Sequence, residues 1–350
     1  MRALIVASFN PGTKGAYIST AFRRLGWETD FFDDWHYGFP GNIKISRLGQ
    51  YLISRLPMLE NSIIRAITDP LFKKKVRSYE PHLIFLSRSD RISASALKTV
   101  KIRTQASLVH WFPDGATHRS FFRILPSLPF LDILFLKDSY ALDLLVGQGF
   151  NRLHFLPQCC SRDVHRRFRL SGKDKQFYGS DIAFTGTLTS GRLKLLDLLS
   201  GFDLKIWCAY PRLQLKSHSF LASRSMGHRA FGVEQTKVFN AAKIIVNLHR
   251  PTDVHGVNLR TFEAAGCGGF QITDRKSDLP LSFDEGTEIV CVDSVEEFPE
   301  IASYYLKHER ERKRIANRAF RRAQAEHTYE HRIASILDHL DLPRESLKGV

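Results

Sequence analysis

The sequence predicts an α/β protein built from two doubly wound parallel sheets that face a cleft. Three observations predict this class. The 350 residues are too many for one ordinary domain. Short apolar runs alternate with segments of helical spacing along nearly the whole chain, which is typical of parallel sheets. The alternation is interrupted once, by a polar and basic stretch at 161–180, and then restarts.

The first half begins with an apolar run that stops at a turn, and strand-like and helix-like segments then alternate. Gly26, Pro81 and Gly149 mark the ends of predicted helices. The predicted strands are 3–8, 28–32, 82–87, 108–112, 133–137 and 152–156. The predicted helices are 16–25, 43–79, 97–103 and 139–148.

The second half repeats this plan without any internal repeat in the sequence. The predicted strands are 181–185, 204–208, 244–248, 270–273 and 288–292, and the predicted helices are 192–200, 236–242, 259–265, 295–305, 309–326 and 330–340. We therefore expect an N-terminal acceptor-side domain at 1–165, a linker at 166–180 and a C-terminal domain at 181–326. A terminal helix and tail at 327–350 are expected to cross back to the N-terminal domain.

Composition and charge exclude several classes of protein. The 43% hydrophobic and 25% charged content excludes a disordered chain or a fibre, and five cysteines without C-x-x-C spacing exclude a disulfide scaffold or zinc ribbon. The net charge is +15, and residues 1–170 hold 25 basic against 13 acidic side chains. This asymmetry predicts an anionic partner for the N-terminal half, with a solvated basic surface as the alternative.

The basic residues of 44–77 lie among Leu, Ile and Phe at helical spacing. Such a helix suits an anionic membrane surface. We expect no signal peptide, because the first apolar run is short and ends in a turn, and no apolar stretch of the sequence is long enough to span a bilayer. The sequence thus predicts a cytoplasmic protein, peripheral at the inner face of the membrane.

The strongest motif runs from Val246 to Gly268. An apolar strand ends in a polar, basic loop, which leads into a helix that begins after Gly256. Free N–H groups at the start of a helix stabilise anions. Arg260 and Glu263, three residues apart, share one helix face. A carboxylate here suits hydrogen bonds to a vicinal diol such as ribose, and an Arg260–Glu263 ion pair on an exposed face is the alternative.

Four segments in a fixed order resemble one family of enzymes. Asn258-x-Arg260-x-Phe262-Glu263-Ala-Ala-Gly-Cys-Gly resembles the donor-binding motif of GT-B glycosyltransferases, and more narrowly that of the group resembling the spore-maturation protein CgeB. Segments 184–192, 206–208 and 327–332 are similar to the family's strand–Gly–loop–Arg opening, second strand and terminal helix. The resemblance covers about residues 180–335 and implies two Rossmann-like domains.

The resemblance also implies roles for single residues. Glu263 would hold the donor ribose, and Arg192 would face the donor diphosphate. His255 stands where many retaining members have a glutamate that touches the donor sugar, and we expect a catalytic role for it. The expected donor-binding residues are Gly186, Arg192, His249, Gly256, Val257, Asn258, Arg260 and Glu263. We expect Glu263→Ala to abolish donor binding with little loss of stability.

The chemistry of these residues fits transfer from a nucleotide sugar. The departing nucleoside diphosphate gains negative charge, which arginines and helix amides stabilise most in the transition state. A D-x-D loop that would hold Mg²⁺ is absent from the sequence. We therefore expect metal-independent transfer, with no cofactor apart from the nucleotide-sugar co-substrate.

Two groups in the N-terminal half are candidates for the acceptor side. Asp114, at the end of the strand 108–112, would act as general base on an acceptor hydroxyl, with a turn-stabilising role as the alternative. Asn10, Gly12 and Lys14 follow the first strand and would form an acceptor or phosphate loop, with a plain turn as the alternative.

The sequence therefore predicts a glycosyltransferase that moves a sugar from a nucleotide sugar to a glycan, lipid-linked or other anionic acceptor. Two alternatives stay open. One is a sugar-nucleotide epimerase or a silent sugar-nucleotide binder. The other is a nucleic-acid-binding protein, suggested by the sequence pI of about 9.7 but without a recognisable nucleic-acid motif.

Overall fold

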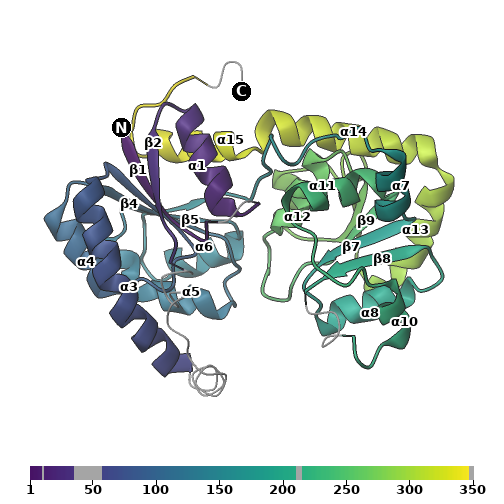
Figure 1. The fold of residues 1–350 in the computed structure, drawn as a ribbon, viewed down its shortest axis with the longest axis horizontal. Helices are drawn as coiled ribbons and strands as arrows, with labels where there is room; N and C mark the ends of the chain where they lie inside the picture. The colour runs from purple at the N-terminus through teal and green to yellow at the C-terminus, as the bar shows by residue number, and fades with distance from the viewer. Residues whose placement is uncertain (10–11, 35–56, 210–214, 347–350) are drawn as a thin grey trace. The chain divides into compact units, whose positions relative to one another are not determined.

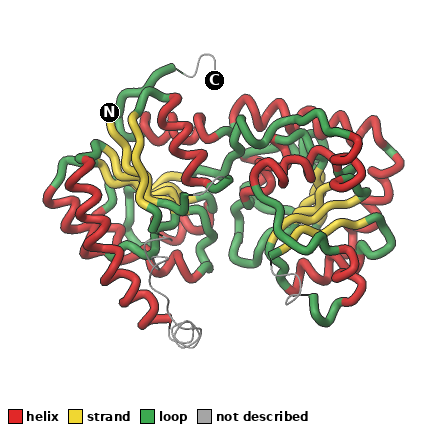
Figure 2. Tube along the Cα trace, viewed as in Figure 1, coloured by secondary structure: helices red, strands yellow, loops and turns green. Residues whose placement is uncertain are grey.

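A computed structural model describes residues 1–9, 12–34, 57–209 and 215–346. The chain divides into two compact units. The first unit comprises Met1–Leu156 and Arg332–Val350, and the second comprises Pro157–His331. Each unit has its own parallel sheet, drawn in yellow in Figure 2 and labelled in Figure 1. The two α/β sheets confirm the predicted fold class.

The first unit contains a six-stranded parallel sheet in the order β2-β1-β3-β4-β5-β6. The strands are β1 (Arg2–Val6), β2 (Glu28–Phe32), β3 (Leu83–Ser87), β4 (Ser107–Phe112), β5 (Ile133–Leu136) and β6 (Leu153–Phe155). The helices are α1 (Lys14–Arg24), α3 (Pro57–Tyr79), α4 (Ala94–Arg103), α5 (Arg119–Ile124), η1 (Leu125–Phe130) and α6 (Ser139–Val146). β3 and β5 are buried along their whole length, because both faces of the sheet are covered.

The second unit contains a five-stranded sheet in the order β11-β10-β9-β7-β8. The strands are β7 (Ile182–Gly186), β8 (Leu204–Cys208), β9 (Ile244–Asn247), β10 (Gln271–Asp274) and β11 (Val290–Val292). The helices are α7 (Gly172–Tyr178), α8 (Ser190–Leu198), α10 (Ser219–Arg224), α11 (Gly232–Ala241), α12 (Leu259–Gly266), η2 (Leu279–Leu281), η3 (Val295–Glu297), α13 (Phe298–Lys307) and α14 (Glu309–Glu326). α15 (Tyr329–Asp338) follows and crosses the boundary between the units.

The order of the strands locates the expected ligand edge of each sheet. In the first unit the winding reverses between β1 and β3, and in the second between β7 and β9. Ligands of open α/β sheets bind beyond the carboxyl ends of the strands at such a reversal. The loops after these four strands are therefore the expected ligand-binding loops.

The predicted linker at 166–180 differs from the structure. Residues from Pro157 onward belong to the second unit, and α7 lies inside the predicted linker. Asp174 of α7 forms an ion pair with Lys237 of α11 at 2.9 Å, and the Phe168 amide donates to the Asn240 side chain. The polarity of this stretch reflects a helix and loop on a protein surface rather than a free connection.

The chain's last described residues pack on the first unit. The indole of Trp27 donates to the carbonyl of Pro343 at 2.9 Å, and the amide of Glu345 donates to the carbonyl of Leu25 at 3.2 Å. The predicted basic helix 43–79 corresponds in part to α3, which is described from Pro57 to Tyr79. Residues 43–56 of that prediction lie outside the described residues.

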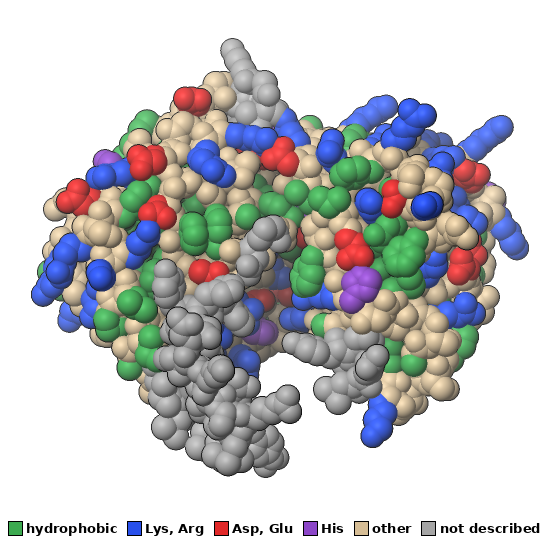
Figure 3. All heavy atoms as spheres, viewed as in Figure 1, with side chains coloured by type: hydrophobic (Ala, Val, Ile, Leu, Met, Phe, Trp, Pro, Cys, Tyr) green, Lys and Arg blue, Asp and Glu red, His purple; other side chains and the backbone are tan. Residues whose placement is uncertain are grey.

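Charged side chains cover much of the face drawn in Figure 3, with Lys and Arg in blue on both units. Within the described residues, none of the helices combines the length and apolar character needed to cross a bilayer.

Candidate functional site

The carboxyl end of β7 brings two arginines close to one glycine. Gly186 ends this strand with φ +150°, and a Cβ built there would lie 2.8 Å from Nη1 of Arg260 and 3.6 Å from Nη1 of Arg192. Nη1 of Arg260 donates to the carbonyl of Thr185. A glycine at this position therefore leaves room for two guanidinium groups beside the end of the sheet.

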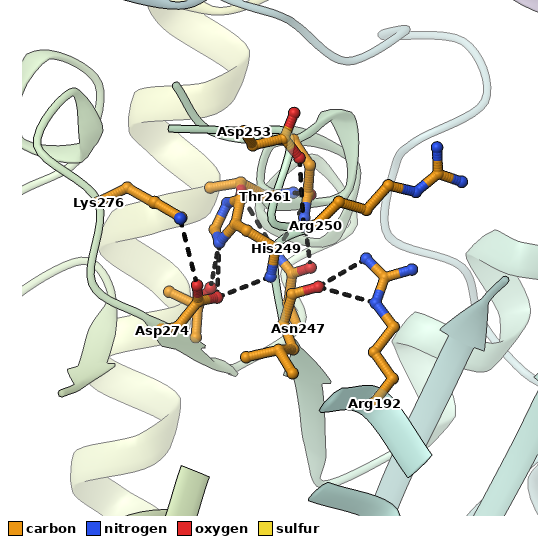
Figure 4. Close-up of polar contacts among 11 residues, drawn as sticks. Arg192, Asn247, His249, Arg250, Asp253, Thr261, Asp274 and Lys276 are labelled. Atoms are coloured by element: carbon orange, nitrogen blue, oxygen red, sulfur yellow. Dashed lines mark hydrogen bonds and ion pairs between the residues drawn. The ribbon is translucent and has the colours of Figure 1, made fainter. Parts of the chain in front are cut away.

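Arg192 joins the loops that follow β7 and β9. It lies in the first turn of α8 and is 5% exposed. Its Nε and Nη2 donate to the carbonyl of Leu248 at 2.9 and 2.6 Å (Figure 4). Its Nη1 donates to the carbonyl of Thr187 at 2.8 Å. Burial, and then the charges of Arg260 and Arg250, lower the pKa of Arg192 to about 10. The group therefore stays positive at neutral pH.

Four arginines share this edge of the sheet. Arg229 and Arg250 lie near enough to Arg260 to affect its pKa, which burial lowers to about 10. The guanidinium of Arg250 extends on the same side as that of Arg192 in Figure 4. Within the described part of the chain, the buried Nε atoms of Arg229 and Arg260 have no hydrogen-bond partner. Glu263 acts on Arg229 and Arg260, but one carboxylate against four arginines leaves an excess of positive charge, so the cluster is suited to a multiply charged anion.

Glu263 points inward from α12 and is 7% exposed. Its Oε2 accepts a hydrogen bond from Nε2 of Gln235 on α11 at 2.6 Å, and its Oε1 lies 3.7 Å from Nε2 of His165. Nδ1 of His165 accepts from the amide of Ser161, and burial lowers the pKa of His165. His165 is therefore neutral and turns its Nε2–H toward the carboxylate, which is held from two sides.

The loop between β9 and α12 is fixed at both ends. Asp274 accepts hydrogen bonds from the backbone amide and Nδ1 of His249, each at 2.7 Å (Figure 4). Burial would raise the pKa of Asp274, but these hydrogen bonds outweigh it and hold the pKa below its usual value. Asn258 caps α12 by accepting from the amide of Thr261, and it also donates to Asn247.

The remaining predicted residues of this loop lie between those two anchors. Gly256 is buried, and Val257 belongs to the hydrophobic core under α12. His255 is half-buried, and its carbonyl accepts from the amide of Asp278 at 3.1 Å. Every predicted donor-binding residue thus lies in or beside the loops after β7 and β9. The exposed-face alternative for Arg260 and Glu263 is wrong, because Glu263 is 7% exposed and the half-buried Arg260 donates to the carbonyl of Thr185.

The structure also adds residues that sequence reasoning missed: Arg229, Gln235 and His165. Each belongs to a segment distant in sequence from the motif at 246–268, so no spacing pattern connects them with it. Arg250 directly follows the strand end, and its position in the motif was the available signal.

The N-terminal candidates lie in the first unit. Oδ2 of Asp114 accepts from Oγ of Ser120 at 3.2 Å and lies 3.5 Å from Nε of Arg88 and 3.7 Å from Nδ1 of His118. Its side chain is 22% exposed, so a hydroxyl could still reach it. The carboxylate already contacts a cation and a hydroxyl. These contacts fit the turn-stabilising role of Asp114 as well as the role of a general base.

The loop after β1 is described in part. Gly12 has φ +84°, which favours glycine there, and Nζ of Lys14 lies 5.8 Å from the ring centre of Trp111. Asn10 lies outside the described residues. Among the described residues, no group of three His, Cys, Asp or Glu side chains is arranged to hold a metal ion.

Asp34 is a buried carboxyl that the sequence did not single out. It is 1% exposed, and neither of its oxygens has a hydrogen-bond partner in the described structure. Burial, with the nearby Asp90 and Asp33, raises its pKa from 3.8 to about 7, although Arg91 opposes this.

Asp34→Asn should change how stability depends on pH. Between about pH 4 and pH 7 the folded protein keeps a proton on Asp34 that the unfolded chain releases, so stability falls as pH rises through this window. Each pKa unit corresponds to about 1.4 kcal/mol. The variant should lose this part of the slope and exceed the parent in stability above pH 7, as measured by urea unfolding across pH. An unchanged slope would contradict the burial of an ionisable group at this position.

Three comparisons with known proteins find similar chains. Residues 192–338 match the family model described as glycosyl transferase-like. The spore protein CgeB of Bacillus subtilis (strain 168) is 22% identical over 261 residues, which are 69% of this chain and 77% of that protein. The sucrose-phosphate synthase of Thermosynechococcus elongatus superposes with a TM-score of 0.70 at 12% identity, covering 97% of this chain and 99% of that one.

A second solved structure similar in fold is Anabaena Alr3699/HepE in complex with UDP-glucose. It has a TM-score of 0.65 at 12% identity and covers 97% of this chain and 99% of that chain. The two sheets and these likenesses show the fold of GT-B glycosyltransferases, and residues 192–338 match a glycosyltransferase family model. Over 69% of its length the chain is similar in sequence to CgeB.

Proposed function

We propose that the four arginines at the carboxyl edge of the second unit's sheet bind the diphosphate of a nucleotide sugar. The observation that carries this proposal is the cluster itself: burial and the charge of Arg250 lower the pKa values of Arg192, Arg229 and Arg260, and among the described residues the buried Nε atoms of Arg229 and Arg260 have no hydrogen-bond partner. A diphosphate would bring further negative charge and acceptor oxygens to such a cluster.

The same cluster would serve the chemical step. When the bond between the sugar and the diphosphate breaks, its electron pair moves to the phosphate oxygen, and negative charge grows there. Fixed guanidinium groups in a buried site stabilise that growth without having to reorganise. In this proposal Glu263 holds the ribose, His255 lies toward the sugar, and Asp114 of the first unit accepts the proton of the acceptor hydroxyl. The transfer needs no metal ion.

The donor proposed is a uridine nucleotide sugar, because a structure of the same fold holds UDP-glucose. The acceptor proposed is a glycan or a lipid-linked molecule, and the enzyme would work at an anionic membrane surface through its first unit. This last point rests on the basic excess of the N-terminal half.

Thermal unfolding with UDP, GDP and a short oligonucleotide tests the proposal. UDP should raise the melting temperature in the presence of EDTA, and the oligonucleotide should not. Stabilisation only by the oligonucleotide would favour the nucleic-acid alternative and overturn the proposal. Release of UDP from UDP-sugar only when an acceptor extract is added would distinguish a transferase from an epimerase or a silent binder.

A further inference from the structure

A basic groove of about 1110 Å³ lies between α3 and α4 of the first unit. The two helices lie side by side in Figure 1, and their carboxyl-terminal ends lead into β3 and β4. Its cationic lining consists of Lys73, Lys74 and Arg77 from α3 and Arg103 from α4. Blue side chains gather at the edge of Figure 3 where α4 lies. The groove is distinct from the loops after β1 and β3, which leave the opposite edge of the sheet.

The charge in this groove is not balanced by the protein. Lys73, Lys74, Arg77 and Arg103 form no ion pair with any described residue, and the carboxylate in the lining, Glu80, lies 3.5 Å from Arg2. Neighbouring cations on the same two helices are paired. Lys75 forms an ion pair with Asp30, and Lys101 lies 2.6 Å from Asp132. Toward the carboxyl ends of α3 and α4, at 73–77 and 101–103, the basic residues are therefore either paired or groove-lining.

The partial negative charges at the carboxyl ends of α3 and α4 compensate only part of the positive charge in the groove. A helix carries about half a negative charge at its carboxyl end, and the effect falls off within the last turn. Arg77 and Arg103 lie in the last turns of α3 and α4. Lys73 and Lys74 lie six and five residues before the end of α3 at Tyr79, which is beyond that turn. A net positive charge therefore remains in the groove.

Exposed apolar side chains accompany the cations. Ile102, next to Arg103, is 73% exposed, and Leu71, two residues before Lys73, is 36% exposed. No aromatic residue lines the groove, so bases of a single-stranded nucleic acid would find no ring to stack on. Cations beside exposed apolar side chains suit the interface of an anionic bilayer.

We propose that this groove docks the first unit on an anionic membrane by receiving phospholipid headgroups, with Ile102 at the acyl boundary. The inference deepens the membrane surface named under the proposed function. Of the three consecutive lysines Lys73, Lys74 and Lys75, only the first two line the groove, because Lys75 is turned to Asp30 and the ring of Tyr79.

Sedimentation with vesicles tests the groove. Vesicles of phosphatidylcholine alone and of phosphatidylcholine with phosphatidylglycerol are mixed with the full-length parent and with a K73A/K74A/R103A variant. The parent should pellet with the anionic vesicles and be released by salt. Each cation near a bilayer changes partitioning about fivefold, so the triple variant should bind about 100-fold more weakly.

Two controls match this variant. Lys75→Ala removes one charge from the same helix outside the groove. R310A/R314A/R318A removes the same number of charges from exposed positions of α14. Both should bind the anionic vesicles within about twofold of the parent. Equal losses in the α14 variant would show general charge attraction, and unchanged binding of the groove variant would show that the groove is not involved. Either result overturns the proposal.

Two further measurements separate this proposal from others. Binding of inorganic pyrophosphate or an oligonucleotide by the groove, without binding of the parent to anionic vesicles, would assign the groove to a soluble anion and overturn membrane docking. The thermal shift with UDP should be the same in the groove variant and the parent. A parent that binds vesicles but not UDP would leave the groove standing while the proposed donor site fails.

Discussion

Replacing Arg192 by alanine is expected to destabilise the second unit by about 3 kcal/mol and to abolish binding of UDP. The side chain makes three hydrogen bonds to the carbonyls of Leu248 and Thr187. Its loss removes the hydrogen-bond donor of both carbonyls, which is costly for buried groups. It also removes one charge from the arginine cluster. Urea unfolding measures the first effect, and titration calorimetry with UDP measures the second.

Two variants separate these effects. Arg192→Lys keeps the charge but cannot reproduce the planar fork that reaches two carbonyls, so it should lose stability while keeping weak binding of UDP. Arg310→Ala removes an exposed arginine of α14 and should change stability by less than about 0.5 kcal/mol. Full stability of Arg192→Ala would show that the hydrogen bonds to Leu248 and Thr187 do not hold these loops.

Glu263→Gln should weaken the binding of UDP about 100-fold and leave the binding of 2′,3′-dideoxy-UDP nearly unchanged. A hydrogen bond to a charged group contributes about 1.5–3 kcal/mol, and the carboxylate would accept two of them from the ribose. The glutamine keeps the size of the side chain, and its amide oxygen can still accept from Gln235, so the fold is preserved. Competition calorimetry with the two nucleotides gives the ratio of affinities.

Gln235→Leu is the matched test of the carboxylate's orientation. It keeps the negative charge of Glu263 but removes the 2.6 Å hydrogen bond that holds Oε2. We expect the affinity for UDP to fall about tenfold, again with little change in the affinity for the dideoxy nucleotide. Equal losses for both nucleotides in either variant would mean that Glu263 supports the protein and does not contact the ribose.

The burial of Glu263 revises the expected effect of Glu263→Ala. The sequence suggested little loss of stability, as for a carboxylate on an open face. In the structure the carboxylate lies between Gln235 and His165, and its charge acts on Arg229 and Arg260. Alanine would leave these groups without their partner, so glutamine is the better substitution for testing binding alone.

Much of the architecture followed from local patterns. A strand such as Leu83–Ser87 is buried on both faces, so its residues are all apolar and it is recognisable from a few letters. The end of β9 and the start of α12 were recognisable because Asn258 is a capping residue before an apolar helix. The predicted linker was placed wrongly, because polar residues are common to linkers and to surface helices such as α7.

The sequence by itself determined the two α/β units, the motif from Asn258 to Gly268 and the basic character of the first half. Only the tertiary structure decided which charges stand together. Arg229, Gln235 and His165 reach Glu263 through contacts between distant segments, and Arg103 joins Lys74 across two helices. The physical reason is that strand and helix propensities act over a few neighbouring residues, whereas burial and Coulomb interactions depend on distance in space.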